Sequence, residues 1–264
     1  MSEILKAITK LEEENIIYVM SHRKNKRTGL NIPIYSLVSG SHEDSRLNID
    51  SLLAGVYTER LVEYAFLERN LIPTNVTATI LDIGSAESVL TKAISKFGIR
   101  RWSVIGIDVR GMPIRQSSSP FVFLRMDSRK LAFRDEVFDQ VICISTIEHI
   151  GIPSETYGIH EKDNIGDLTT ISEIYRILKK GSTLILTLPY GKMMTQGKDH
   201  RIYDRNSLAN LISKFSTVKK EFYKYDKGKW KKCTSQSAVD NTANREQTPL
   251  YLHSGVCVCL CLKK

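Results

Sequence analysis

TATILDIG at residues 77–84 and WSVIGIDV at residues 102–109 are short apolar runs, each with an aspartate near its carboxyl end. Two further apolar runs follow, FVFLRMD at 121–127 and DQVICIS at 139–145. Helical or polar segments separate the four runs. Short apolar runs that alternate with helical segments are typical of the strands of a parallel sheet. The sequence therefore predicts an α/β fold.

The carboxyl-terminal half continues this alternation. ISEIYRILKKG at 171–181 predicts a helix that ends at Gly181, and STLILTLP at 182–189 predicts a strand buried on both faces. RNSLANLISKF at 205–215 predicts another helix, which Asp204 can cap. Two strands follow, KKEFYKYD and the final GVCVCLCL.

The last strand contains three of the five cysteines, which alternate with aliphatic residues. Cys257, Cys259 and Cys261 therefore face one side of that strand. Zinc motifs usually place cysteine pairs on a turn, so we interpret these thiols as buried apolar groups and predict no metal site.

The amino-terminal part differs in character from the rest of the chain. Residues 1–14 predict a short helix, and the apolar runs at 16–20 and 32–38, separated by a basic turn, predict a hairpin with a long tip. We therefore divide the chain into an N-terminal extension at 1–49 and a domain at 50–264, whose motif core is 78–191. Apolar positions at helical spacing between residues 52 and 67 predict the first helix of that domain.

Composition restricts the class of protein. A chain of 264 residues with 42% hydrophobic content can bury a full core. No run approaches the roughly 18 apolar residues that span a bilayer, and the start is too charged for a signal peptide, so we expect a cytoplasmic protein. The net charge of +9 is concentrated at 23–27 and 219–232, which fits either a solvated surface or an anionic partner such as nucleic acid.

Aspartates near the ends of consecutive strands give the first chemical signal. Asp82, Asp108 and Asp127 close three predicted strands, and Gly84 opens the loop after the first. In an open parallel sheet the carboxyl ends of the strands line the ligand crevice. A glycine there permits close approach of a ligand, and a carboxylate at the second strand can accept both hydroxyls of a ribose. The pattern predicts a nucleoside cofactor.

The first loop distinguishes two candidate cofactors. NAD requires G-x-G-x-x-G, where glycines and a helix N-terminus receive the pyrophosphate. Here the loop is Gly84-Ser85-Ala86-Glu87-Ser88, with one glycine and a carboxylate. Glu87 would repel a pyrophosphate but tolerates the cationic end of a sulfonium cofactor. We therefore favour S-adenosylmethionine over NAD.

Residues 80–191 resemble the class I methyltransferase family, in particular its methyltransferase type 11 group. The resemblance is carried by LDIGSAES, GIDVR, MDSRKLAFRDEVFDQVICISTIEHIG and EIYRILKKGSTLILTLPYG. It implies a Rossmann-like, doubly wound, mostly parallel seven-stranded sheet with helices on both faces and a C-terminal antiparallel strand. ISTIEHIG, Tyr157-Gly158, LPYG and RIYD further resemble methyltransferases of sugar or polysaccharide modification. The glycine-poor loop at 84–88 departs from the family pattern.

The family roles carry over to matching positions of this chain. Asp82, Gly84 and Ser85 would hold the methionine end, Asp108 the ribose, and Asp127 with Ser128 the adenine. Three other residues complete the predicted cofactor site: Glu87, Val109 and Ser145. Each aspartate could instead cap a turn at its strand end.

His149, after the fourth strand, is our first candidate for a general base, because an imidazole titrates near the pH of catalysis. Its neighbour Glu148 fits a capping box that begins at Ser145, so we expect a structural role for it. Tyr157 and His200, on the loops after the fourth and fifth strands, are the other catalytic candidates. Further polar residues of these loops could meet the acceptor, and Trp230 could stack on a sugar or base: His160, Glu161, Asp163, Tyr190, Asp199, Arg201 and Tyr203.

We therefore expect a methyltransferase that acts on a small-molecule or glycan acceptor, by O-methylation. One alternative is an RNA methyltransferase that uses the basic segment KKEFYKYDKGKWKK. The other is a non-catalytic scaffold that binds a partner through its N-terminal hairpin, a hypothesis motivated by the atypical loop.

Overall fold

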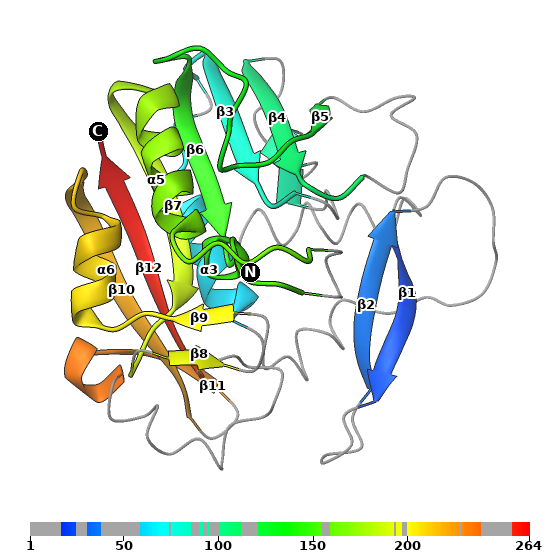
Figure 1. Cartoon of the computed structure of the whole chain (residues 1–264), viewed down its shortest axis with the longest axis vertical. Helices are drawn as coiled ribbons and strands as arrows, with labels where there is room; N and C mark the ends of the chain where they lie inside the picture. The colour runs from blue at the N-terminus through cyan, green and yellow to red at the C-terminus, as the bar shows by residue number, and fades with distance from the viewer. Residues whose placement is uncertain are drawn as a thin grey trace.

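The computed structural model describes residues 17–24, 31–37, 59–73, 75–85, 90–91, 94–95, 101–111, 121–154, 159–192, 194–196, 200–226, 229–238 and 255–264. The predicted helix at 1–14 and the first half of the predicted helix at 52–67 lie outside these residues. The predicted hairpin is present, because β1 (Ile17–Lys24) pairs antiparallel with β2 (Asn31–Leu37), at right in Figure 1.

One eight-stranded sheet forms the centre of the molecule, in the order β11-β10-β12-β7-β6-β3-β4-β5 (Figure 1). The strands from β7 to β5 pair in parallel, whereas β12 pairs antiparallel with β7 and β10. The strands are β3 (Ala78–Ile83), β4 (Trp102–Asp108), β5 (Val122–Arg125), β6 (Phe138–Ile144), β7 (Leu178–Pro189), β10 (Ser216–Asp226), β11 (Lys229–Cys233) and β12 (Val256–Lys263). The predicted doubly wound, mostly parallel sheet with a C-terminal antiparallel strand is confirmed, but it has eight strands instead of the predicted seven, because β11 adds a strand at its edge.

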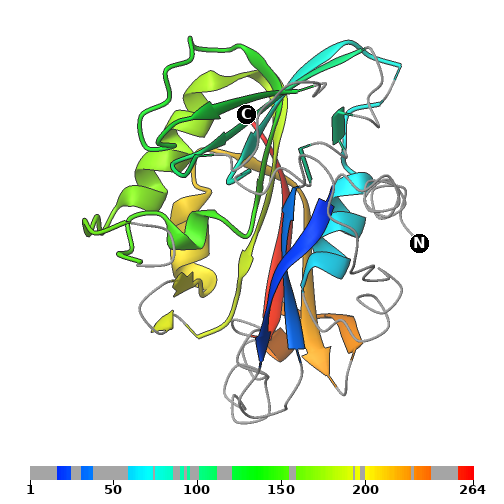
Figure 2. The same ribbon diagram turned by 90° about the vertical axis from the view of Figure 1, so that its right-hand side faces the viewer.

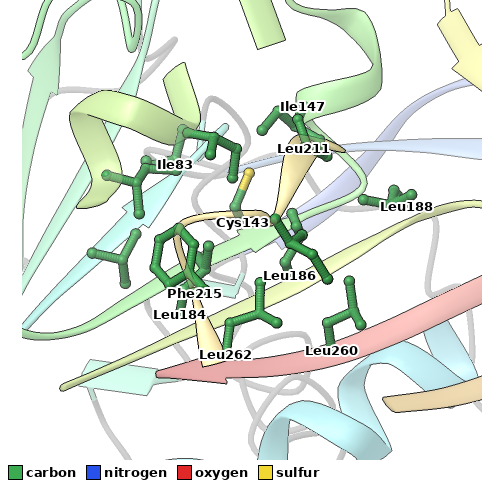
Figure 3. Close-up of a cluster of buried hydrophobic side chains, with 14 of the residues drawn as sticks. Ile83, Cys143, Ile147, Leu184, Leu186, Leu188, Leu211, Phe215, Leu260 and Leu262 are labelled. Atoms are coloured by element: carbon green, nitrogen blue, oxygen red, sulfur yellow. The ribbon is translucent and has the colours of Figure 1, made fainter. Parts of the chain in front are cut away.

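Helices cover both faces of the sheet. Figure 2 shows α3 (Arg60–Glu68) on one side, and α5 (Gly166–Ile177) and α6 (Arg205–Leu211) on the other. The alternation of side chains along the strands supplies one apolar layer to each helix layer. In Figure 3, Leu211 and Phe215 pack among the aliphatic side chains of β7 and β12.

β12 contributes to both layers. Cys257, Cys259 and Cys261 belong to the layer beneath α3, and the intervening aliphatic residues belong to the opposite layer. All three thiols are free and buried, as the interpretation of the alternating cysteines requires. Among the described residues, no group of three His, Cys, Asp or Glu side chains could hold a metal ion.

The structure corrects several local predictions. α5 ends at Ile177 rather than at Gly181, which does adopt a positive φ of 78° but lies within β7. β11 and the short pair β8 (Met194–Gln196) and β9 (His200–Ile202) were not predicted, since their sequences are polar. The predicted cap of α6 is confirmed, because Asp204 and Ser207 form a capping box.

Candidate functional site

A cavity of about 270 Å³ opens at the carboxyl ends of β3, β4, β5 and β6. Of the twelve predicted site residues, Glu87 and Tyr157 lie outside the described residues. Nine of the others line the cavity: Asp82, Gly84, Ser85, Asp108, Val109, Asp127, Ser128, Ser145 and His149. The sheet topology thus brings together residues that are more than 60 positions apart in the sequence.

The loop after β3 is shaped by Gly84. Its φ is +86°, a conformation that L side chains rarely adopt, and a Cβ at this position would overlap the side chain of Thr146. The backbone N–H groups of Gly84 and Ser85 both donate to the carbonyl of Ile107, at 2.9 and 3.0 Å. These bonds hold the loop against the end of β4 and keep its backbone beside the cavity.

Asp82 is the most buried of the three aspartates, with 3% of its surface exposed. Thr91 donates a hydrogen bond of 2.5 Å to Oδ2. Burial raises the pKa of Asp82 to about 7, partly offset by that bond and increased further by the negative charge of Asp108. Asp82 can therefore take up or release a proton near neutral pH.

Asp108 and Asp127 are each paired with an arginine two positions further on. Arg110 donates to Asp108 from its backbone N–H and from Nε, at 2.9 and 3.1 Å, both to Oδ1, and from Nη2 to Oδ2 at 3.2 Å. Arg129 binds both oxygens of Asp127 and reaches Oδ2 of Asp163 at 3.1 Å. Burial acts to raise the pKa of Asp127, but the hydrogen bonds from Arg129 outweigh it and lower that pKa.

Both arginines line the cavity, and the sequence analysis missed them. The signal was available, because Asp-Val-Arg and Asp-Ser-Arg occur at the ends of consecutive strands. An Asp-x-Arg sequence at a strand end allows the arginine side chain to fold back and donate hydrogen bonds to the aspartate. The lining of the cavity thus includes three arginines as well as the three aspartates: Arg110, Arg129 and Arg60 of α3.

Glu63 of α3 is fully buried and joins α3 to β7 and to the residue that follows β6. Its Oε1 accepts hydrogen bonds of 2.6 Å from both Ser145 and Thr187, and its Oε2 pairs with Arg60. Ser145 has a positive φ of 40°, which is uncommon for a residue other than glycine, and such conformations cluster at active and ligand-binding sites. Helical periodicity marks the apolar face of α3 but gives no sign that a glutamate lies within it, so this network was also missed.

His149 ends the 3-10 helix η1 (Ile147–His149), which follows β6, and lines the cavity. His200 lies on β9, with 6% of its surface exposed, and its ring contacts that of His149 at 5.8 Å between centroids. His200 is not among the described residues that line the cavity, but its ring contacts His149, which does line it.

The capping box predicted for Glu148 is wrong. Thr146 is the N-cap of η1 and its side chain makes no capping hydrogen bond. Glu148 instead points into the protein and is fully buried. Because η1 begins after Thr146, Glu148 is the second residue of the helix and not the third, which is the position that a capping box requires.

Trp230 lies on β11, packs edge-on against Tyr225 at 5.9 Å, and is half-buried against the apolar layer beneath α3. It is not among the described residues that line the cavity.

No helix within the described part of the chain is long and apolar enough to span a bilayer.

The strand order and the cavity at the strand ends define the fold of class I S-adenosylmethionine-dependent methyltransferases. The chain belongs to the family described as "Caenorhabditis protein of unknown function, DUF268", whose model matches residues 122–253, half of its length. A search of curated proteins finds no match.

Solved structures share the fold at low sequence identity. A methyltransferase of Thermotoga maritima, described as a possible histamine N-methyltransferase, is 16% identical with a TM-score of 0.51 and covers 82% of this chain and 94% of its own. Phosphoethanolamine N-methyltransferase 2 of Haemonchus contortus is 17% identical with a TM-score of 0.51 and covers 77% of this chain and 52% of its own. The cyclase SpnF is 14% identical with a TM-score of 0.51 and covers 77% of this chain and 80% of its own. Because one of the three is named as a cyclase, the fold alone does not define the reaction.

Proposed function

We propose that the protein is an S-adenosylmethionine-dependent methyltransferase. The observation that carries this proposal is the convergence of Asp82, Asp108 and Asp127 on one cavity behind a loop with a single glycine. Carboxylates suit the hydroxyl, amino and ammonium groups of this cofactor, whereas they would repel the pyrophosphate of NAD. When bound, the cofactor supplies an electrophilic methyl group.

The residues of the cavity suggest how each part of the cofactor would be held. We assign the ribose to Asp108, at the end of β4, and the adenine to Asp127 and Ser128, after β5. The methionine end would lie near Asp82, and the Gly84 loop would allow its close approach. Further contacts would come from four residues: Ser85, Glu87, Val109 and Ser145.

Arg60 adds a group that the sequence did not suggest. Its guanidinium pairs with Glu63, and its side chain, 39% exposed, lines the cavity on the α3 side. A carboxylate is the ligand for which a guanidinium is best suited. We therefore assign the α-carboxylate of the cofactor to Arg60, while Asp82 would meet its ammonium group.

The acceptor that we propose is a neutral hydroxyl of a small molecule or glycan. The three arginines that line the cavity are already paired, Arg110 and Arg129 with aspartates of the cavity and Arg60 with Glu63, so they offer little charge to a strongly charged acceptor. The resemblance of ISTIEHIG and LPYG to sugar-modifying methyltransferases supports the same class. A hydroxyl requires a base, and His149 is the imidazole that lines the cavity.

Ion pairing weakens the case for RNA as the acceptor. Lys231 pairs with Asp226 and Lys232 with Glu221, both at 2.8 Å, so part of the basic segment is already neutralised. An RNA acceptor would require binding that falls steeply with added salt. The scaffold hypothesis would require a site that binds no cofactor or transfers no methyl group.

Isothermal titration with S-adenosylmethionine, and separately with NAD, tests the proposal. We expect micromolar binding of S-adenosylmethionine and none of NAD. Asp108→Asn should weaken binding at least tenfold, because each charge-assisted hydrogen bond contributes roughly 1.5–3 kcal/mol. Asp135→Asn, at an exposed position before β6, is the matched control and should change nothing. Binding of NAD alone, or equal binding by the Asp108 variant, would refute the assignment.

A further inference from the structure

Asp163 lies outside the cavity, yet it is bonded to two residues of the cavity wall. Its Oδ2 accepts a hydrogen bond of 3.1 Å from Nη1 of Arg129, and its backbone N–H donates one of 2.9 Å to the carbonyl of Gly151. Arg129 and Gly151 line the cavity, whereas Asp163 is not among the described residues that do. Asp163 can therefore influence a bound ligand through these two partners.

Gly151 and Asp163 are the two ends of a loop that forms one wall of the cavity. Arg201 joins these ends, because its Nη1 donates to the carbonyl of Ile150 at 2.6 Å and its Nη2 to that of Asp163 at 3.2 Å. The ends are in close contact, since a Cβ at Gly151 would overlap the backbone oxygen of Asp163. Ile150, Gly151 and Ile159 line the cavity. The position of this wall thus depends on the bonds at Asp163.

Arg129 is shared between Asp163 and Asp127, the carboxylate to which we assign the adenine. Its Nε donates to both oxygens of Asp127, at 3.1 and 3.0 Å, and its Nη2 to Oδ2 at 2.7 Å, so that Nη1 is left for Asp163. Hydrogen bonds from Arg129 to both carboxylates raise the pKa of the guanidinium, which stays charged. Because a guanidinium is a rigid fork of donors, the bond to Asp163 prevents Nη1 from turning onto Asp127.

We propose that Asp163 is a positioning residue for the cofactor that acts through Arg129: it holds one end of the guanidinium and so leaves Asp127 able to accept the amino group of the adenine. This inference rests on the proposed function and adds to it a residue that the ligand does not touch. Without the charge of Asp163, Arg129 would bind Asp127 alone and compete more strongly with the adenine.

The same coupling acts in the opposite direction, because two linked binding equilibria change each other by the same factor. When the adenine occupies Asp127, Arg129 loses part of its bonding there and binds Asp163 more tightly. The bonds at Asp163 in turn fix the loop that ends at this residue. We therefore expect the cofactor to stabilise the loop wall, and an acceptor that contacts this wall to bind after the cofactor.

A double-mutant cycle measured by isothermal titration with S-adenosylhomocysteine tests the link. Asp163→Asn removes the charge and keeps an Oδ1 acceptor for the backbone N–H of Ile165. We expect it to weaken binding by about twofold to fivefold, the range typical of a partly exposed ion pair. In the Arg129→Met background the same substitution should change nothing. Asp135→Asn, which breaks an aspartate–arginine pair outside the cavity, is the matched control and should leave the affinity unchanged.

Hydrogen exchange at the backbone N–H of Ile159, which donates to the carbonyl of Ser154 within the loop, provides the second measurement. Saturation with S-adenosylhomocysteine should slow this exchange in the unsubstituted protein, and by about twofold to fivefold less in Asp163→Asn.

A merely structural role of Asp163 predicts different results. The Asp163→Asn substitution would then weaken binding equally with and without Arg129, and the ligand would slow the exchange equally in both proteins; either result would overturn the inference while the proposed function stands. Absence of S-adenosylhomocysteine binding by the unsubstituted protein would refute the proposed function itself, and the inference with it.

Discussion

Arg110 holds both oxygens of Asp108, so the side chain that we assign to the ribose is already paired in the structure. A ribose would have to compete with Arg110 for these oxygens. The pair is partly exposed, with 33% of the arginine side chain in contact with solvent. Such pairs typically contribute up to ~1 kcal/mol, so a ligand can displace the arginine at modest cost.

Arg110→Met should therefore tighten the binding of S-adenosylhomocysteine by about twofold to fivefold, as expected from the loss of a competitor of up to ~1 kcal/mol. Isothermal titration measures the change. Arg101→Met, at the amino-terminal side of β4, is the control and should have no effect. Weaker binding by the Arg110 variant would mean that this arginine itself contacts the cofactor.

Asp82 predicts a dependence of stability on pH. Its pKa is about 7 in the folded protein and 3.8 in an ordinary setting, so the folded state holds the proton more tightly than the unfolded chain. The stabilisation from this group is fully present below pH 3.8 and is lost as the pH rises through about 7. The difference corresponds to an upper limit of ~4 kcal/mol, at 1.36 kcal/mol for each pKa unit.

Urea denaturation of the unsubstituted protein and of Asp82→Asn at pH 5 and pH 8 isolates this contribution. We expect the free energy of unfolding to decrease from pH 5 to pH 8, and to decrease by more in the unsubstituted protein than in the variant. Burial also raises the pKa of Glu59 to about 7. Glu59 contributes equally to the pH dependence of both proteins, so its effect cancels when they are compared. Parallel pH curves for the two proteins would contradict the assignment of a buried, protonated Asp82.

At the scale of elements, the loop between β3 and the helical residues that follow depends on Gly84. Gly84→Ala would place a Cβ at a φ of +86° and against Thr146. The left-handed conformation alone costs an L residue roughly 1–2 kcal/mol, and relief of the overlap would move the loop. We expect cofactor affinity to fall at least tenfold.

Gly111→Ala is the matched control for this loop. A Cβ at Gly111 would meet no atom within 4 Å, and its backbone does not require glycine. The two variants should therefore differ in both melting temperature and cofactor affinity. Equal behaviour would show that the Gly84 loop does not shape the site.

The strands could be predicted because their sequences are apolar and short. β3, β4, β6, β7 and β12 lie at the apolar runs that predicted them. β11 could not be found this way, since KWKKC is mostly basic and pairs at the edge of the sheet, where one neighbour suffices. The capping box at Ser145 failed because a sequence pattern cannot distinguish a helix start from one turn of 3-10 helix.

Some features of the site can be predicted from the sequence, and others depend on contacts that the sequence does not show. Strand-end aspartates are visible in the sequence, because topology alone brings such ends together. The pairing of Asp108 with Arg110 is local and could have been inferred from Asp-x-Arg. The burial of Glu63 and Glu148 could not have been inferred from the sequence, because it depends on contacts between elements that are distant in sequence.

At the scale of the whole molecule, Glu63 ties α3 to the sheet. It accepts hydrogen bonds from β7 and from the residue after β6, and it pairs with Arg60. Glu63→Ala should lower the free energy of unfolding by at least ~2 kcal/mol, because hydrogen bonds to a charged group contribute roughly 1.5–3 kcal/mol each. Urea denaturation provides the measurement.

Arg69→Ala, which breaks an exposed pair with Glu221 at the other end of α3, is the control for Glu63. It should cost ~1 kcal/mol or less. If both variants lose the same small amount of unfolding free energy, the apolar face of α3 alone holds this helix on the sheet. The Glu63 variant should also bind cofactor less well, because Ser145 and Arg60 would both lose a partner.

The most direct test of the account is the crystal structure of the protein with S-adenosylhomocysteine. We predict that the ribose hydroxyls lie on Asp108, with Arg110 displaced, and that the adenine lies beside Asp127 and Ser128. A ligand bound elsewhere, or an Asp108–Arg110 pair left intact beside the bound ligand, would contradict the assignment of the three strand-end carboxylates to the cofactor.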